Sequence, residues 1–235
     1  MGPFTPLILA GGLGTRLRPA LADRPKVLAL VNGRPFLSYL LDQQVDAGMR
    51  EVVLCIGHLG ELVVQAFGDA YRGMVVRYSK ESKPLGTGGA LRHALALVRS
   101  ETILVMNGDS YCDIDLKSFI DWHIEKRFGA SFVLAKVDDV GRYGSVGIDG
   151  DGRVLSFEEK STNRGLGWIN AGIYLFERAT LSSMPEGGSI SLEREVLPRL
   201  VKKGFYGCCC HGEFIDIGTP ESYRLAGEFF GGARV

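Results

Sequence analysis

Short apolar runs alternate with segments of helical spacing from residue 7 to about residue 106, and this order strongly limits the possible folds. We expect helices at 35–48, 59–67 and 88–98, and buried strands at 7–10, 52–56, 74–78 and 103–106. Parallel neighbouring strands need a crossover, which is usually a helix. The alternation therefore predicts a doubly wound, Rossmann-like α/β sheet with helices on both faces.

The second half of the chain follows a different rhythm. After a helix expected at 116–127, strands are expected at 131–136, 144–148, 154–158 and 168–176. The link 149–152, Asp-Gly-Asp-Gly, is a strong hairpin signal. A helix at 191–203, a strand at 205–211 and a final helix opened by Thr219-Pro220 complete the chain. We expect a mixed sheet with a small antiparallel β portion, in one continuous domain, 1–235.

Charge and hydropathy exclude several classes of partner. Lys and Arg together number 27, as do Asp and Glu, so no overall charge draws the chain to nucleic acid or to an anionic membrane. The longest apolar runs, at 51–56 and 102–106, are far shorter than the roughly 20 residues of a membrane-spanning helix. The first residues lack the basic and apolar regions of a secretion signal. We therefore expect a cytoplasmic enzyme that holds any anionic ligand by local groups.

A glycine-rich loop follows the first strand. Gly11, Gly12 and Gly14 let the backbone turn tightly and point N–H groups at an anion, and the cations Arg16 and Lys26 lie in or near the loop. A dinucleotide-binding loop would need a third glycine where the chain has leucine at position 17, and a Walker A lysine is absent. The loop predicts phosphate binding, although the glycines alone would also fit a structural turn.

Two aspartates are expected at strand ends. Asp109 follows the fourth core strand, and Asp216 lies in an apolar stretch before a helix cap, where an acid usually has a partner. Together they could hold one Mg²⁺. Asp113 and Asp115 form the Asp-x-Asp pattern of a metal-dependent glycosyltransferase, but Asp115 is better placed to cap the helix that begins at Leu116.

These motifs, in this order and across nearly the whole chain, resemble the sugar-1-phosphate nucleotidylyltransferases. The matching segments are Leu9-Ala10-Gly11-Gly12-Leu13-Gly14-Thr15-Arg16-Leu17, Arg24-Pro25-Lys26, Pro84-Leu85-Gly86-Thr87-Gly88-Gly89-Ala90, Asn107-Gly108-Asp109, Glu158-Glu159-Lys160 and Asp216-Ile217-Gly218-Thr219-Pro220. Within the family, segments 31–37, 142–146 and 168–174 resemble the guanylyltransferases that act on D-glycero-α-D-manno-heptose 1-phosphate.

The resemblance implies a nucleotide-diphospho-sugar transferase fold, with GTP and a sugar 1-phosphate as substrates and Mg²⁺ as cofactor. The implied catalytic residues are Arg16, Lys26, Asp109 and Asp216, and the two aspartates would hold the metal. The implied nucleotide-binding residues are Leu9, Gly11, Gly12, Gly14, Thr15, Arg16, Glu81, Gly86, Thr87, Gly88, Asn107 and Gly108. The implied sugar-phosphate contacts are Gly144, Glu159, Lys160 and Asn170.

Glu81 is the reason to expect GTP as the nucleotide substrate. It lies five residues before Gly86, where thymidylyl- and uridylyltransferases of the family commonly have glutamine. A carboxylate only accepts hydrogen bonds, and guanine offers adjacent N1–H and N2–H donors, whereas the uracil edge has one donor between acceptors. The other interpretation is an exposed loop glutamate among Lys80 and Lys83.

Other functions stay open at this point. A related enzyme could use mannose 1-phosphate with GTP, or another hexose 1-phosphate with UTP or dTTP. A non-catalytic nucleotide-sugar sensor would be free to lose its cations and metal ligands, all of which are present here. The resemblance also suggests precursor supply for a heptose-containing capsule polysaccharide. The sequence does not fix the oligomeric state, for which a homodimer is one option.

Overall fold

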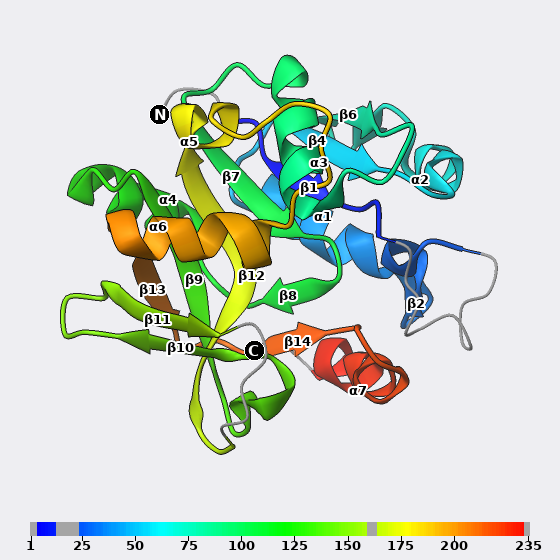
Figure 1. The fold of residues 1–235 in the computed structure, drawn as a ribbon. Coiled ribbons are helices and arrows are strands. Elements are labelled where there is room, and N and C mark those ends of the chain that lie inside the picture. The colour runs from blue at the N-terminus through cyan, green and yellow to red at the C-terminus, as the bar shows by residue number, and fades with distance from the viewer. Residues whose placement is uncertain (1–3, 13–23, 159–163, 233–235) are drawn as a thin grey trace.

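A computed structural model describes residues 4–12, 24–158 and 164–232. Its centre is an eight-stranded sheet with the order β13-β9-β12-β7-β1-β4-β6-β5 (Figure 1). All of these strands run in one direction except β12 and β5. The strands are β1 (Leu7–Leu9), β4 (Glu51–Ile56), β5 (Ala70–Tyr71), β6 (Met74–Lys80), β7 (Thr102–Asn107), β9 (Ala130–Val137), β12 (Gly167–Glu177) and β13 (Tyr206–Cys210).

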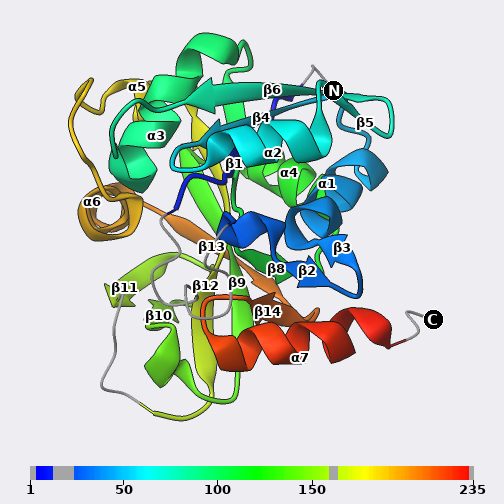
Figure 2. The ribbon, with the colours of Figure 1, turned by 90° about the vertical axis from the view of Figure 1, so that its right-hand side faces the viewer.

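Helices cover both faces of this sheet (Figure 2). One face carries α1 (Phe36–Asp46), α2 (Gly60–Phe67) and α4 (Leu116–Lys126), and the other carries α3 (Gly86–Ala94), α5 (Arg178–Ser182) and α6 (Leu197–Lys203). The last helix, α7 (Pro220–Gly231), packs beside the strand that precedes it. The predicted doubly wound α/β sheet is confirmed. In the described part of the chain, no helix combines the length and apolar character that crossing a membrane requires.

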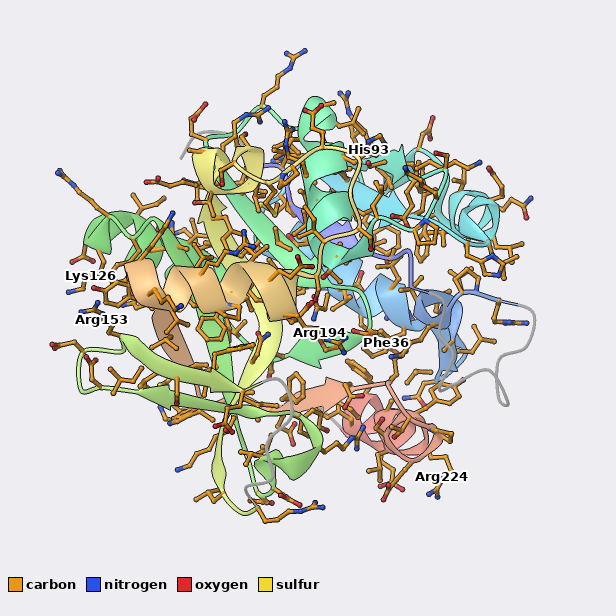
Figure 3. All side chains as sticks on the ribbon, in the orientation of Figure 1. Phe36, His93, Lys126, Arg153, Arg194 and Arg224 are labelled. Carbon is orange, nitrogen blue, oxygen red and sulfur yellow. The ribbon has the colours of Figure 1, made fainter. Side chains whose placement is uncertain are left out.

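The strands divide their side chains between two cores. In β4, Val52 and Leu54 belong to one apolar cluster, whereas Val53 and Cys55 belong to the other. Successive residues of a strand point to opposite faces, so a continuous apolar run is the pattern that a sheet covered on both sides requires. Charged side chains such as Lys126 lie at the periphery (Figure 3).

Three small antiparallel pairs complete the β-structure. The predicted hairpin is β10 (Ser145–Ile148) with β11 (Val154–Glu158), and the others are β2 (Leu30–Val31) with β3 (Arg34–Pro35) and β8 (Ser110–Cys112) with β14 (Phe214–Asp216). The pairing of β8 with β14 was not expected from the sequence. Each of its strands is too short to show a clear alternation of polar and apolar residues. The two strands are also far apart in the chain, so no hairpin signal joins them.

Short helical turns change some predicted bounds. The helix expected at 191–203 begins with a π-helical turn, η4 (Leu192–Val196), before α6, because Pro198 has no N–H to donate to the preceding turn. The helix expected at 88–98 starts two residues earlier and ends in the 3₁₀ turn η2 (Leu95–Leu97). The predicted caps Asp115 and Thr219 both accept backbone N–H bonds at the first turns of α4 and α7.

His123 makes the stability of the fold sensitive to pH. Its side chain is 2% exposed and its Nδ1 lies 2.7 Å from the Ser131 hydroxyl. Burial lowers the pKa of His123 from 6.5 to about 4. The folded protein therefore holds the neutral ring, while the unfolded chain takes up a proton as the pH falls below 6.5.

We predict that the free energy of unfolding is highest above pH 6.5 and falls by on the order of 3 kcal/mol as the pH drops toward 4. Urea denaturation of the wild type and of His123→Gln, measured across this range, checks the prediction. The exposed His93 supplies the matched control, His93→Gln. If the free energy of unfolding fell equally with pH in the wild type and in His123→Gln, His123 would not be the source of the pH dependence.

Candidate active site

A cavity of about 580 Å³ opens beyond the carboxyl ends of β1 and β7. This edge of a doubly wound sheet is where ligands of such folds bind. Many of the residues expected at the site line this cavity: Leu9, Gly11, Gly12, Lys26, Glu81, Gly86, Thr87, Asn107, Gly108, Asp109 and Asp216.

Close backbone packing places Asp109 at the cavity. The N–H of Gly108 donates to the carbonyl oxygen of Leu9 at 2.9 Å, which joins the ends of β7 and β1. A Cβ at Gly108 would lie 2.4 Å from that oxygen, so only glycine fits here. The glycine therefore holds the next residue, Asp109, beside the carboxyl end of β1.

The ladder between β8 and β14 brings Asp216 to the same place. In this ladder Asp216 stands opposite Ser110, the residue after Asp109. The N–H of Ile217 donates to the carbonyl oxygen of Asp109 at 2.9 Å. Two aspartates from distant parts of the chain thus face one cavity, as the sequence predicts.

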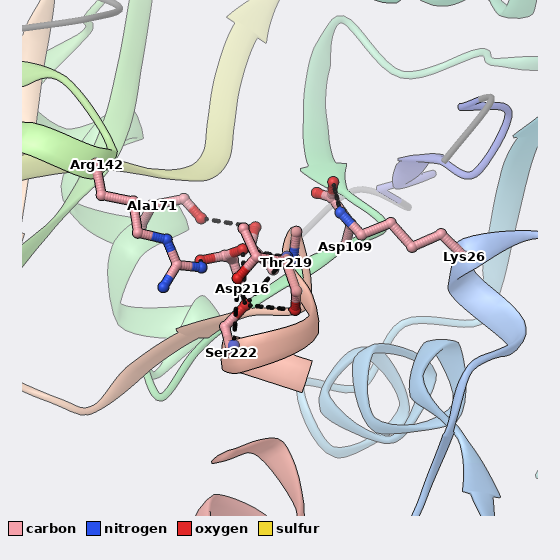
Figure 4. A network of polar contacts seen from close by, with 9 residues as sticks. Lys26, Asp109, Arg142, Ala171, Asp216, Thr219 and Ser222 are labelled. Carbon is pink, nitrogen blue, oxygen red and sulfur yellow. Dashed lines mark hydrogen bonds and ion pairs between the residues drawn. The ribbon is translucent and has the colours of Figure 1, made fainter. Parts of the chain in front are cut away.

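Each of these carboxylates has a cation partner (Figure 4). Lys26, in the 3₁₀ turn η1 (Lys26–Leu28), donates from Nζ to Oδ2 of Asp109 at 2.8 Å. Arg142, which ends the 3₁₀ turn η3 (Val140–Arg142), donates from Nη2 to Oδ2 of Asp216 at 2.8 Å. The N–H of Gly218 donates to the other oxygen of Asp216 at 2.5 Å. Two carboxylates and two cations are therefore paired here, and Lys26, Asp109 and Asp216 line the cavity.

The carboxylate pair fits a divalent cation. Mg²⁺ takes hard oxygen ligands and is usually held by one or two carboxylates, with substrate phosphates and water completing its shell. Asp109 and Asp216 supply two carboxylates at one edge of a cavity wide enough for a nucleotide. Lys26 and Arg142 hold the same oxygens by hydrogen bonds that a cation would have to replace.

Glu81 also lines the cavity. Its N–H donates to the carbonyl oxygen of Ile56 at 3.0 Å, and its Oε2 accepts from the N–H of Leu85 at 3.1 Å. Burial raises the pKa of Glu81 above its ordinary value, against the opposing effects of the Leu85 hydrogen bond and the nearby His93. Glu81 is thus a half-buried acceptor on the cavity wall, not an exposed loop residue.

The second glycine-rich segment is fastened to the chain before α6. Gly86 has a φ of +70°, and the N–H of Gly88 donates to the carbonyl oxygen of Ile190 at 2.8 Å. The Thr87 hydroxyl donates to Oε2 of Glu193 at 2.8 Å and accepts from the N–H of Leu192 at 2.7 Å. The N–H of Gly88 is therefore used within the protein, and Gly88 does not line this cavity among the described residues.

Glu193 is a cavity residue that the sequence reasoning missed. Its carboxylate accepts hydrogen bonds from Thr87 and, at 3.2 Å, from the Ser191 hydroxyl. The sequence predicts only that a helix starts in this segment. The only signal in the sequence was the change from glycines and serines to alternating charges at 187–195.

The expected sugar-phosphate contacts are less closely gathered. Gly144 and Asn170 are not among the described residues that line the cavity. The N–H of Gly144 donates to the carbonyl oxygen of Val140, and the amide of Asn170 donates to the Tyr174 hydroxyl at 2.7 Å. The remaining expected residues lie outside the described ranges: Gly14, Thr15, Arg16, Glu159 and Lys160.

The Asp-x-Asp pattern does not form a joint site. Oδ1 of Asp115 accepts from the N–H groups of Lys117 and Ser118, so this carboxylate caps α4. The N–H of Asp113 donates to the carbonyl oxygen of Glu213, in the connection to β14. The Asp-x-Asp pattern therefore does not support the alternative function as a metal-dependent glycosyltransferase.

Comparisons with known proteins agree with this geometry. The profile described as "Nucleotidyl transferase" matches residues 5–231. D-glycero-alpha-D-manno-heptose 1-phosphate guanylyltransferase of Aneurinibacillus thermoaerophilus is 35% identical over 94% of this chain and 95% of its own. The enzyme of the same name from Campylobacter jejuni subsp. jejuni is 37% identical over 92% of this chain and 96% of its own.

Two further proteins bear on the fold and the ligand. The crystal structure of HddC from Yersinia pseudotuberculosis complexed with GMP-PN is 35% identical, has a TM-score of 0.85 and covers 97% of this chain and 99% of its own. Mannose-1-phosphate guanylyltransferase of Mycobacterium tuberculosis is 36% identical over 92% of this chain, which spans 62% of that protein. With a profile match over nearly its whole length and these relatives, the chain belongs to the nucleotidyl transferase family.

Proposed function

We propose that this protein transfers GMP from GTP to D-glycero-α-D-manno-heptose 1-phosphate, which gives the GDP-sugar and pyrophosphate. The observation that carries the proposal is one cavity lined both by an acceptor for the base, Glu81, and by the carboxylate pair Asp109 and Asp216. The two heptose 1-phosphate guanylyltransferases that match along nearly their full length support this choice of sugar.

The chemistry asks for positioning and charge neutralisation. An oxygen of the sugar phosphate attacks the α-phosphorus of GTP, and the bond from that phosphorus to the bridging oxygen of pyrophosphate breaks. The sugar phosphate arrives ionised, so no residue has to remove a proton. Because charge gathers on the phosphoryl oxygens, fixed cations and N–H groups lower the barrier.

The described residues have distinct tasks in this scheme. The backbone at Gly11 and Gly12 lies against the triphosphate, and Glu81 accepts hydrogen bonds from guanine. Lys26 reaches the cavity from η1 and brings a positive charge to the phosphates. Asp109 and Asp216 would hold Mg²⁺, which when bound neutralises the charge that the two phosphorylated substrates share.

Further residues complete the proposal by resemblance, and all of them except Asn170 lie outside the described ranges. Arg16 stabilises the transferred phosphoryl group and the leaving pyrophosphate, and Gly14 and Thr15 extend the phosphate loop. Lys160 holds the sugar phosphate, while Glu159 and Asn170 contact sugar hydroxyls. A cytoplasmic location, expected from the short apolar runs, and a part in heptose-containing capsule synthesis, suggested by the resemblance, remain predictions.

Mannose 1-phosphate is the second candidate substrate. The observation in its favour is the 36% identity to the mannose-1-phosphate guanylyltransferase of Mycobacterium tuberculosis, although this chain covers only 62% of that protein. A non-catalytic sensor is disfavoured because Lys26, Asp109 and Asp216 are all present and line one cavity.

Pyrophosphate release tests the function directly. We expect the purified chain with Mg²⁺ to release pyrophosphate from GTP fastest with D-glycero-α-D-manno-heptose 1-phosphate, more slowly with mannose 1-phosphate and very slowly with glucose 1-phosphate. Replacing GTP by UTP, dTTP or CTP should lower the rate strongly. A preference for a pyrimidine nucleotide would refute the role of Glu81, and no release with any pair would refute the enzyme.

The role of Glu81 predicts a pH dependence. Because burial raises its pKa, Glu81 takes up a proton at a higher pH than an ordinary glutamate, and a protonated carboxyl no longer accepts two hydrogen bonds. The KM for GTP should therefore rise as the pH falls from neutral toward the acid range. In Glu81→Gln, KM should be high at every pH and change only with the ionisation of GTP itself. Parallel KM profiles for the two proteins would show that Glu81 does not bind the base.

Two substitutions test the charge stabilisation. Asp109→Asn and Arg16→Ala should each lower turnover by on the order of a hundredfold or more, because each removes a charge that acts on the transition state. Circular dichroism and thermal melting should show an intact fold. Near-normal turnover in either variant would remove that residue from the mechanism.

A further inference from the structure

Arg142 lies beside the proposed metal site. Its guanidinium is 2.8 Å from Asp216 and rests over the ring of Tyr143, 4.9 Å from the ring centre. Two residues further along the chain is Gly144, whose backbone is an expected contact of the sugar hydroxyls. Arg142 is therefore a cation bonded to one proposed metal ligand and close in the chain to an expected sugar contact.

The backbone that carries Arg142 is firmly held. The N–H of Val140 donates to the carbonyl oxygen of Gly165, and the carboxylate of Asp139 accepts from the N–H of Gly141 at 2.9 Å. The N–H groups of Tyr143 and Gly144 both donate to the carbonyl oxygen of Val140. The side chain of Arg142 is 34% exposed, so a long, partly solvated side chain extends from a fixed turn.

Asp216 cannot serve Arg142 and a divalent cation equally. Its side chain is 16% exposed, and its Oδ2 accepts from Arg142 while its Oδ1 accepts from Gly218 and, at 3.5 Å, from Ser222. A cation on Oδ2 would repel the guanidinium across a short distance in a partly desolvated site. The guanidinium that it releases is a planar fork with donors that match two oxygens of a phosphate.

We propose that Arg142 is a positioning residue that holds Asp216 in the free protein and moves to the phosphate of the sugar 1-phosphate when Asp216 takes the metal ion. Binding of the cation and binding of the sugar phosphate are thereby coupled through one side chain. The inference rests on the proposed function of the same cavity.

Binding of Mn²⁺ without any substrate tests the first half of the proposal. Free Mn²⁺, measured by its electron paramagnetic resonance signal, reports affinity without catalysis. Because a partly exposed ion pair is weak, Arg142→Gln should bind Mn²⁺ about two- to fivefold more tightly than the wild type. Arg34 forms an arginine–aspartate pair with Asp42 away from the cavity, so Arg34→Gln is the matched control and should bind like the wild type.

Steady-state kinetics test the second half. In Arg142→Gln the KM for the sugar 1-phosphate should rise about tenfold or more, because a charged bidentate hydrogen bond is lost, while the KM for GTP stays near that of the wild type. Arg142→Lys keeps the charge without the fork and should recover only part of the loss. Thermal melts of all variants confirm that each remains folded.

The outcomes separate this inference from the proposed function. Unchanged or weaker Mn²⁺ binding by folded Arg142→Gln, or an unchanged KM for the sugar phosphate, overturns the inference while leaving the guanylyltransferase intact. Failure of the wild type to release pyrophosphate with any sugar 1-phosphate overturns the function. The Mn²⁺ titration still decides in that case whether Arg142 competes for Asp216.

Discussion

The contact between β8 and β14 is the constraint on which the candidate site depends. Asp109 is held at the end of the parallel sheet by β7 and its glycine, but Asp216 comes from a strand that does not belong to that sheet. The short ladder and the hydrogen bond from Ile217 to Asp109 fix the second carboxylate beside the first. Without this pairing the sheet would carry one acid and no site for a bridging cation.

Charge balance at this edge follows from the same geometry. Two carboxylates drawn together in a partly desolvated cavity repel each other, and each is compensated by one cation. Lys26 and Arg142 come from two different 3₁₀ turns, one before the first helix and one in the antiparallel half of the chain. The site is therefore assembled from four separate segments, which explains how a chain of zero net charge can hold polyanionic substrates.

The sequence predicted the layers of the fold and most of the residues at the cavity. Continuous apolar runs and glycine loops are local signals, so the core strands, Asp109 and the loop at Gly11 could be located. Other features depend on contacts between segments that are distant in the chain, and no local sequence pattern predicts them. They are the β8–β14 ladder, the place of Glu193 and the ion pair of Arg142. Gly88 shows the reverse case: a local motif locates the segment, but only the structure shows that the N–H of Gly88 donates to the carbonyl oxygen of Ile190.

The attachment of the segment at 86–89 to Ile190, Leu192 and Glu193 has a consequence for recognition of the nucleotide. Polar groups of this segment are already hydrogen-bonded to residues 190–193 of the same chain before any ligand binds. They are the N–H groups of Gly88 and Gly89 and the hydroxyl of Thr87. This wall is preorganised, and the conformational entropy of its loop is lost during folding instead of during association. In the proposed complex, the nucleotide would therefore meet a wall whose shape is set before binding.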